Sequence, residues 1–511
     1  MHCCDTSHND CKVLQGTDFP SRLVEVGPDD DHIRLVETKG GKGEYAALSY
    51  CWGQNSIQLK ATGPTLDKMK SHIPQEQLPK TIQDAMKLTR MLGLKYVWID
   101  CLCILQDSDP DWETEAAKMG QYYQYAKLTI AASAAVSASC GLFNRRSKVS
   151  KPKQIHFRDS DGSMYPLVAQ GRSIKLWTDM IDDLGPLSER GWTFQEHALS
   201  GRIIHLTEGE MIWECPSEMT SEDGHPIRNN CHSMIKEFRM ERQKSPENYW
   251  RFLVRAYSGR RLSYSKDKLP AIAGMADYYH EMADQQYLAG LWRENLPIDL
   301  LWSSWGWEEA DKPPKILPGP SWSWASIDGG VAFIAEPIGY DFPLEVHTRV
   351  NNVHCSVPGN NPFGQVERGT LDVAGPVLEM NIRYDGENDE DGFPQIQLDY
   401  DELTELKFFP DTSLMACNMT DRYNGAKLTV RRSSASPKPF QASVLCLWVL
   451  TLDETPPSEL QLSFGVKPFH IHGIILANTG LVPDEYCRVG MVSTLDSRAI
   501  ELATEKRLTI I

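Results

Sequence analysis

The order of three segments between residues 45 and 104 constrains the fold most strongly. The apolar, β-compatible run YAALSYCW, which begins at Tyr45, predicts a buried strand. The next segment, TIQDAMKLTRMLG, predicts a helix, because Thr81 and Asp84 have the spacing of a capping box and Gly93 ends the pattern. A second apolar run, LKYVWIDCLCI, follows directly. A strand, a helix and a strand in this order predict a βαβ unit, whose strands run parallel with a right-handed crossover.

Similar alternation continues along the chain. Asp109 as N-cap and Pro110 at the first helical position begin a second helix, which is followed by the strand candidate KLTIAAS. A third helix is entered from Pro186, and the segment RIIHLTEGEMIWEC reads as a hairpin. We therefore expect an α/β fold with a mainly parallel sheet and flanking helices, then a helical extension and a β-rich C-terminal region. The predicted boundaries are a flexible N-terminal tail at 1–18, the α/β domain at 19–215, the extension at 216–317 and the β-rich region at 318–511.

Charge and hydropathy narrow the classes of partner. The 511 residues include 69 acidic and 52 basic side chains, a formal charge of −17, which repels phosphate backbones and anionic lipid surfaces. The longest weakly polar runs are too polar or too short to span a bilayer. We expect a cytoplasmic protein that binds no nucleic acid and has no membrane span.

The thirteen cysteines are an odd number in a chain with no secretory signal, so they are expected to be reduced thiols. Cys3, Cys4, His8 and Cys11 are residue types that bind metal, or that carry a palmitoyl group, but no second ligand pair lies at zinc spacing. The segment is therefore predicted to be a disordered tail, with no metal.

Polar side chains fall where the third helix should face the core. On a helical wheel Gln195 lies inside the apolar arc, and Glu196 lies at its rim beside Trp192. The alternative is that Trp192 is only a core residue and Glu196 a structural one.

The second helix has a similar anomaly at Glu115, which shares a face with apolar side chains. A buried carboxylate needs a partner, since an unpaired charge in the core is costly. The candidate partners are Arg190, Arg202 and Arg145. A structural ion pair of this kind is an alternative to a catalytic role.

In parallel sheets, ligands bind at the carboxyl ends of the strands. Trp52 is at the end of the first predicted strand, and Asp100 to Cys103 are at the end of the second. Asp100 could instead cap the next turn, and Trp52 could be a core residue. The nearby cysteines are expected to be small buried residues. For His197 and His205 we expect surface or hairpin positions.

Several motifs are missing. The chain has no GxxxxGK[ST], GxGxxG or GxSxG, which argues against a P-loop NTPase, a common dinucleotide oxidoreductase and an α/β-hydrolase. The segment HEMAD lacks the second histidine of a zinc protease, and ENDEDG lacks the final glutamate of a calcium loop. No metal site is predicted.

Three long blocks resemble the fungal heterokaryon-incompatibility (HET) domain in order and spacing. They are YAALSYCWG at 45–53, the segment from LPKTIQDAM to KLTIAAS at 78–133, and GPLSERGWTFQEHALSGRIIHLTEGEMIWEC at 185–215. Two positions differ from the usual family pattern, Tyr50 in the first block and His197 in the third.

The resemblance implies an effector of non-self recognition that triggers programmed cell death when unlike hyphae fuse. It also implies a distant, TIR-like or flavodoxin-like relationship to domains of which some cleave NAD with a glutamate on a helix. Under that reading NAD is a substrate and no bound cofactor is expected. The candidate catalytic residues are then Glu196, Glu115, Asp100 and Arg190, and the candidate binding residues are Trp52, Trp192 and Gln195.

Whether the chain is an enzyme stays open on the sequence. If it is one, the expected class is an NAD glycohydrolase-like hydrolase. One alternative is a non-catalytic module that associates with itself or with an incompatibility partner protein. Another is a regulatory protein associated with a metabolite gene cluster.

Overall fold

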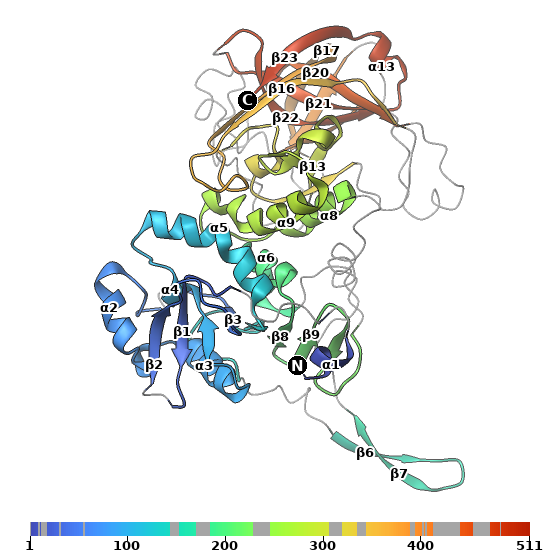
Figure 1. Ribbon diagram of the computed structural model, residues 1–511. Helices are drawn as coiled ribbons and strands as arrows, with labels where there is room; N and C mark the ends of the chain where they lie inside the picture. Colours follow the sequence, from blue (N-terminus) through green and yellow to red (C-terminus); the bar gives the residue numbers. More distant parts are fainter. Residues whose placement is uncertain are drawn as a thin grey trace. The chain divides into compact units, whose positions relative to one another are not determined.

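The computed structural model divides into two compact units (Figure 1). The first contains Met1–Arg242 and Ala271–Met275, and the second contains Gln243–Pro270 and Ala276–Ile511. The structure describes residues 2–8, 11, 18–29, 32–54, 57–143, 153–169, 184–227, 246–305, 319–334, 344–388, 394–400, 403, 406–411, 440–452, 471–480 and 482–511.

An eight-stranded sheet forms the centre of the first unit, in the order β10-β9-β8-β5-β3-β4-β1-β2. Its strands are β1 (Arg22–Val26), β2 (Ile33–Glu37), β3 (Ala46–Ser49), β4 (Tyr96–Trp98), β5 (Leu128–Ala131), β8 (Ile203–Leu206), β9 (Met211–Glu214) and β10 (Met219–Ser221). The four central strands β4, β3, β5 and β8 are parallel. The outer strands pair antiparallel. The sheet is therefore mixed rather than mainly parallel. The short connections from β1 to β2, from β8 to β9 and from β9 to β10 can join only antiparallel neighbours, and β1 also pairs antiparallel with β4.

The predicted βαβ unit is confirmed. After helix α2 (Gly63–Ser71) and the 3₁₀ helix η1 (Gln75–Gln77), helix α3 (Lys80–Met91) leads into β4, and Ala46 pairs with Val97 in parallel register. Its ends differ from the expectation: Pro79 is the N-cap, and neither Thr81 nor Asp84 caps the helix. The Thr81 hydroxyl instead accepts a hydrogen bond of 3.0 Å from the Gly141 amide, and the Asp84 carboxylate accepts one of 3.0 Å from Leu142. Thr81 and Asp84 therefore hydrogen-bond the loop at Gly141 and Leu142 instead of capping the helix.

Two further helices follow the predicted order. Helix α5 (Asp109–Tyr125) lies between β4 and β5, with Ser108 rather than Asp109 as its N-cap. Helix α6 (Thr193–Leu199) lies between β5 and β8, after the short 3₁₀ helix η3 (Pro186–Glu189). Figure 1 shows α5 beside α6, which packs against it.

The chain reverses direction across this sheet. It passes from β3 to β4 through α3, and then returns past β3 to β5 through α5. Because right-handed crossovers in opposite directions place their helices on opposite faces, α3 and α5 cover different faces of the sheet. The hairpin predicted at 202–215 is confirmed as β8 and β9, which pair antiparallel. The sheet continues past residue 215, because β10 pairs with β9.

The start of the chain has more structure than the predicted tail. Residues His2–Ser7 form helix α1, and Cys4 and Cys11 are buried with Cys215. The Arg202 guanidinium contacts the Asp5 carboxylate at 2.6 Å. A sequence pattern over 1–18 cannot show these contacts, because their partners lie some two hundred residues further along the chain.

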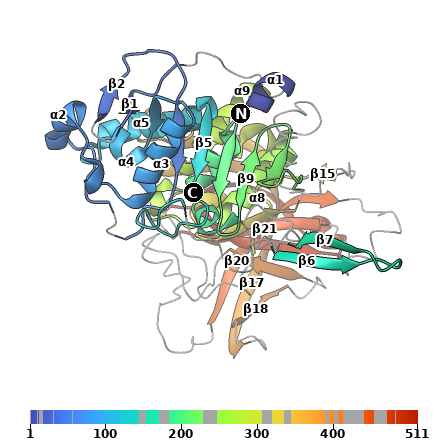
Figure 2. The same cartoon turned by 90° about the horizontal axis from the view of Figure 1, so that it is seen from below.

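Strands β6 (Lys153–Arg158) and β7 (Met164–Ala169) form a separate two-stranded hairpin (Figure 2). Large apolar side chains on this hairpin are exposed. They are Ile155, Phe157, Met164, Tyr165 and Leu167.

The second unit starts with helices and continues with strands. Its helices include α8 (Pro246–Ser258), most of α9 (Ala273–Ala283) and α10 (Leu296–Asp299). The segment predicted as a helical extension also contains short strands: β11 (Tyr287–Leu288) pairs with β12 (Leu291–Trp292), and β13 (Trp302–Trp305) pairs with β14 (Gly330–Phe333).

The predicted β-rich C-terminal region is confirmed as a nine-stranded sheet. Its strands are β15 (Leu344–Val346), β16 (Arg349–Ser356), β17 (Arg368–Asn388), β18 (Pro394–Asp399), β19 (Lys407–Pro410), β20 (Phe440–Leu452), β21 (Ile471–Asn478), β22 (Glu485–Thr494) and β23 (Thr504–Ile510). Strand β17 pairs with β23 through its first half and with β20 through its second half. The strands β20-β21-β22-β23-β17 are thus hydrogen-bonded in a closed ring.

Among the described helices, none has the length and apolar character needed to cross a membrane.

Candidate functional site

The carboxyl ends of β3 and β5 mark the point where the chain changes direction across the first sheet. Ser49, the last residue of β3, pairs with Ala131, the last residue of β5. The crossover from β3 leads to β4 on one side, and the crossover that ends at β5 arrives on the other. In open α/β sheets ligands bind outside the carboxyl ends of the strands at such a switch point.

Glu196 lies directly at this point. Helix α6 brings its carboxylate to the end of β3, where the Ser49 hydroxyl donates a hydrogen bond to Oε2. The glutamate is 7% exposed. Burial raises its pKa to about 7, because the charged form loses water. The Ser49 hydrogen bond lowers this pKa and the Asp100 charge raises it further, whereas Arg190 and Tyr123 lower it.

Asp100 lies at the end of β4, at the start of the short helix α4 (Asp100–Cys103). Its Oδ1 accepts hydrogen bonds from the Tyr50 hydroxyl at 2.8 Å and the Cys101 amide at 2.6 Å. Its Oδ2 accepts one from Trp52 Nε1 at 2.7 Å. Desolvation raises the pKa of Asp100, and these hydrogen bonds oppose the rise. Asp100 therefore ties the segment after β3 to the segment after β4.

Arg190 connects η3 to the same edge of the sheet. Its guanidinium donates a hydrogen bond of 3.0 Å to the Tyr50 carbonyl. Its charge also lowers the pKa values of Glu196 and Asp100. The nearby Cys51 is buried, as predicted, and burial raises the pKa of its thiol.

Two partly exposed tryptophans accompany these groups. Lys60 Nζ lies 4.7 Å from the centre of the Trp52 ring. Trp192 makes an edge-to-face contact with Trp112, with ring centres 6.2 Å apart.

The family of this region is established by comparison. Residues 45–196 match the family described as heterokaryon incompatibility protein (HET). The chain carries a HET domain. No curated protein and no solved structure matches the chain. Ser49, Trp52, Asp100, Arg190 and Glu196 all lie within the matched residues, and Glu196 is the last of them.

Glu115 lies in a different part of the HET domain. It is 2% exposed, and it accepts a hydrogen bond of 2.8 Å from the Tyr122 hydroxyl. Its cationic neighbour is Arg22 of β1, with Nη2 at 4.0 Å from Oε1, and Arg22 also contacts Asp111 at 2.5 Å. Among the described residues, the structure thus pairs Glu115 with Arg22 and not with Arg190 or Arg202. Arg202 instead pairs with Asp5, and Arg145 lies outside the described residues.

Gln195 is fully buried, as the helical wheel predicts. Its hydrogen-bond partner differs from that of Glu196. Its Oε1 accepts a hydrogen bond of 3.0 Å from the Gly274 amide at the start of α9. Gly120 of α5 lies so close to Gly274 that an added Cβ would approach the Gly274 Cα to 2.9 Å. Gln195 therefore lies where Gly120 and Gly274 allow the backbones of α5 and the start of α9 to approach each other.

Two functional groups at the Glu196 site carry no clear signal in the sequence. Ser49 is one polar residue in an apolar run, and only the strand register reveals that it ends β3. The Tyr123 hydroxyl donates a hydrogen bond of 3.0 Å to the Leu48 carbonyl and lies beside Glu196.

A cluster of His197, His205 and Glu214 lies between α6 and the β8–β9 hairpin. Both histidine Nε2 atoms contact Glu214 Oε2, at 2.8 and 2.7 Å. His205 is buried on β8, a hairpin position as predicted, and the His197 side chain is 17% exposed. Two nitrogen or oxygen ligands of one zinc ion are usually about 3 Å or more apart, so these shorter contacts are hydrogen bonds.

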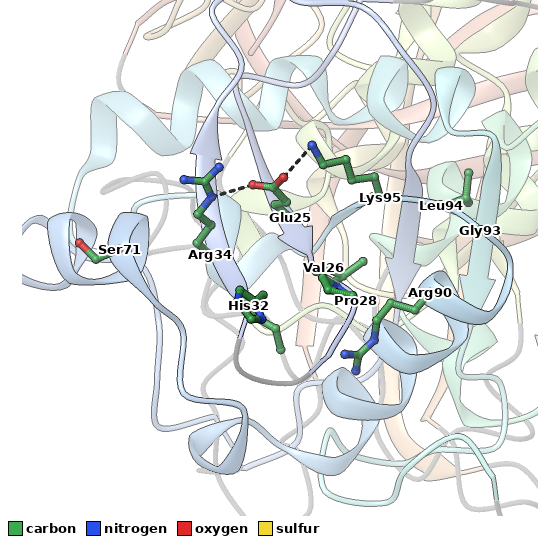
Figure 3. Close-up of a pocket in the computed structure, with 12 residues that line it drawn as sticks. Glu25, Val26, Pro28, His32, Arg34, Ser71, Arg90, Gly93, Leu94 and Lys95 are labelled. Atoms are coloured by element: carbon green, nitrogen blue, oxygen red, sulfur yellow. Dashed lines mark hydrogen bonds and ion pairs between the residues drawn. The ribbon is translucent and has the colours of Figure 1, made fainter.

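A groove of about 710 Å³ lies elsewhere in the first unit (Figure 3). Glu25 lies between Arg34, at 2.6 Å, and Lys95, at 2.8 Å, as Figure 3 shows. Gly93 and Lys95 precede β4, so this groove lies at the amino end of a parallel strand. That is the edge opposite to the switch point, and Glu25, Arg34 and Lys95 are already paired with one another there.

Proposed function

We propose that this protein is an effector of fungal non-self recognition and cell death, and that its HET domain hydrolyses the nicotinamide–ribose bond of NAD. The observation that carries the proposal is Glu196, a buried carboxylate with a pKa of about 7 at the switch point of the sheet. Groups that exchange protons near neutral pH are typical of catalytic sites. The strand order β4-β3-β5-β8 is also that of flavodoxin-like sheets. The likeness to NAD-cleaving TIR domains is an analogy of fold.

The proposed roles follow from the positions of the side chains. Trp52 and Trp192 are partly exposed and offer ring faces for a base or a nicotinamide. Arg190 supplies positive charge near the strand ends and suits a phosphate of the dinucleotide. Asp100 holds Tyr50 and Trp52 in place and acts as a positioning residue.

The reaction would take place at C1′ of the nicotinamide riboside. The C1′–N bond breaks, and its electron pair goes to the nicotinamide ring, which leaves as a neutral molecule. The ribose becomes an oxocarbenium-like cation, which ionised Glu196 stabilises electrostatically. Water then forms the new C1′–O bond, and Glu196 accepts its proton. The products are ADP-ribose, nicotinamide and one proton.

The test compares the full chain with a Glu196→Gln variant in an assay of nicotinamide release from NAD. The variant keeps the shape and a hydrogen-bonding group for Ser49 but cannot accept the proton, so its rate should fall by about 100-fold or more. Glu189→Gln, at an exposed position of η3, is the matched control and should keep the rate. If the parent chain releases no nicotinamide, or if the Glu196 variant releases it as fast, the enzymatic part of the proposal is wrong.

A second candidate function is a non-catalytic interaction module that associates with another copy of the chain. The hairpin of β6 and β7 favours it. Ile155 pairs with Leu167 and Phe157 with Tyr165, so these four apolar side chains share one face, and each is about half exposed. Exposed apolar patches are typical of interaction sites. Light scattering of the full chain and of a Phe157→Ser variant tests this, since a monomeric parent chain would exclude self-association.

A further inference from the structure

The strongest unexplained cluster in the described residues joins the start of the chain to the end of β9. It consists of Cys4, His8, Cys11 and Cys215. Each residue offers one ligand atom, and these atoms all lie within 4.8 Å of one another. The three cysteines are at most 3% exposed, and the His8 side chain is 18% exposed.

We propose that these four side chains bind one zinc ion. Three thiolates and one imidazole are a common donor set of structural zinc sites, with tetrahedral geometry. The softness of thiolate ligands argues against calcium and magnesium.

The two distances from His8 fit a single tetrahedral ion. His8 Nδ1 lies 3.6 Å from Cys11 Sγ and 3.6 Å from Cys215 Sγ. Zinc–sulfur bonds of about 2.3 Å and zinc–nitrogen bonds of about 2.0–2.1 Å, at tetrahedral angles, place sulfur and nitrogen about 3.5–3.6 Å apart. Both measured edges have this length.

The surrounding groups are those that zinc ligands usually have. His8 turns Nδ1 to the thiols, and its Nε2 lies 3.8 Å from the Glu218 carboxylate. A carboxylate on the second nitrogen of a ligating histidine fixes the ring and makes it a better ligand. Backbone hydrogen bonds from Ser217 and Glu218 also reach the Cys215 sulfur.

Positive charge also lies next to the site. Three thiolates and Zn²⁺ leave one net negative charge. The Arg202 guanidinium donates a hydrogen bond of 2.7 Å to the Cys11 carbonyl, so its charge lies beside the site. Cysteines bind zinc as thiolates, so zinc binding would displace thiol protons.

The site also explains why α1 occupies its position. A helix of six residues is too short to be stable in water by itself. Two of the ligands, Cys4 and His8, lie in and just after α1, and Cys215 immediately follows β9. An ion at this point would fix the start of the chain to the sheet of the first unit.

The first experiment measures bound metal in the full chain, purified without an affinity tag that binds metal. We expect about one zinc ion per chain by inductively coupled plasma mass spectrometry. Replacement of the zinc by Co²⁺ should give the absorption bands of a tetrahedral thiolate site. A chain that contains no zinc and takes up neither Zn²⁺ nor Co²⁺ would overturn the proposal. So would a disulfide between any two of the three cysteines in the freshly purified protein.

The second experiment uses variants. Cys215→Ser should lose the zinc, whereas Cys140→Ser, at an exposed cysteine, should retain all of it. Glu218→Gln, outside the ligand set, tests the site independently of the fold around Cys215, with an expected loss of zinc affinity of about 10-fold. Equal zinc content and equal affinity in all three variants would contradict the assignment. These readouts do not depend on NAD cleavage.

Discussion

Glu196→Gln should make the protein more stable at alkaline pH, although the change touches a candidate catalytic residue. The carboxylate is buried, and its pKa rises from the ordinary 4.5 to about 7. The folded protein therefore binds this proton more tightly than the unfolded chain does. The stabilisation is complete below pH 4.5 and is lost as the pH rises through 7.

The magnitude follows from the same two values. At about 1.4 kcal/mol per pH unit, full ionisation of Glu196 costs about 3 kcal/mol of folding free energy. Most of this cost, roughly 2–3 kcal/mol, arises between pH 5 and pH 8. Glutamine resembles the protonated carboxyl group in shape and does not ionise. The variant should gain this amount relative to the parent chain as the pH rises.

The assay is chemical denaturation of both proteins at pH 5 and pH 8, followed by tryptophan fluorescence. The measured quantity is the change, between the two pH values, in the difference between the unfolding free energies of the variant and the parent. Glu189→Gln, at an exposed site, should show no such change. If the unfolding free energy of the Glu196 variant does not rise relative to that of the parent chain between pH 5 and pH 8, the burial of an ionisable Glu196 is not what limits stability at this site.

Other substitutions test separate contacts. Asp100→Ala leaves the Tyr50 hydroxyl, Trp52 Nε1 and the Cys101 amide without their acceptor, and should lower the unfolding free energy by about 3 kcal/mol in denaturant titrations. Gly120→Ala puts a Cβ 2.9 Å from both the Gly274 Cα and Leu199 Cδ1, and should lower the unfolding free energy by about 1–3 kcal/mol. Gly201→Ala, with no atom nearer than 3.9 Å, should be tolerated, and melting temperatures of the two variants distinguish these outcomes. Arg488→Met leaves Asp411 buried without the guanidinium at 2.8 Å, and should destabilise the second unit by about 3–5 kcal/mol, with partial recovery when Asp411→Leu is added.

Local patterns were sufficient for much of the first sheet. Strand β3, helix α3 and strand β4 were predictable, because apolar runs and Gly93 mark their limits within a short stretch of chain. Strands β1 and β2 were not, because RLVEV and IRLVE mix charged and apolar residues as antiparallel strands with one covered face do. The sheet is mixed in part because β1 and β2 pair antiparallel, and a βαβ pattern does not predict such strands.

Prediction of the site had a similar limit. The helical wheel places Gln195 and Glu115 on inner faces, and both are buried. It does not reveal which element covers each face. Arg22 reaches Glu115 from β1, and Gly274 reaches Gln195 from the start of α9. Cys215 meets Cys11 across 204 positions of sequence, which no spacing rule for metal ligands includes.

The two buried glutamates of the HET domain show why burial alone does not select a catalytic residue. Glu115 has a hydroxyl donor in Tyr122 and the charge of Arg22 within 4.0 Å, and Arg22 in turn holds Asp111. This arrangement resembles a structural ion pair. Glu196 also has a hydroxyl donor, Ser49, but Arg190 uses its guanidinium on the Tyr50 carbonyl, and its charge does not offset the effect of burial on the Glu196 pKa. A carboxyl group with a pKa near neutral pH can give or take a proton at little cost, so we assign the proposed catalytic role to Glu196 and not to Glu115.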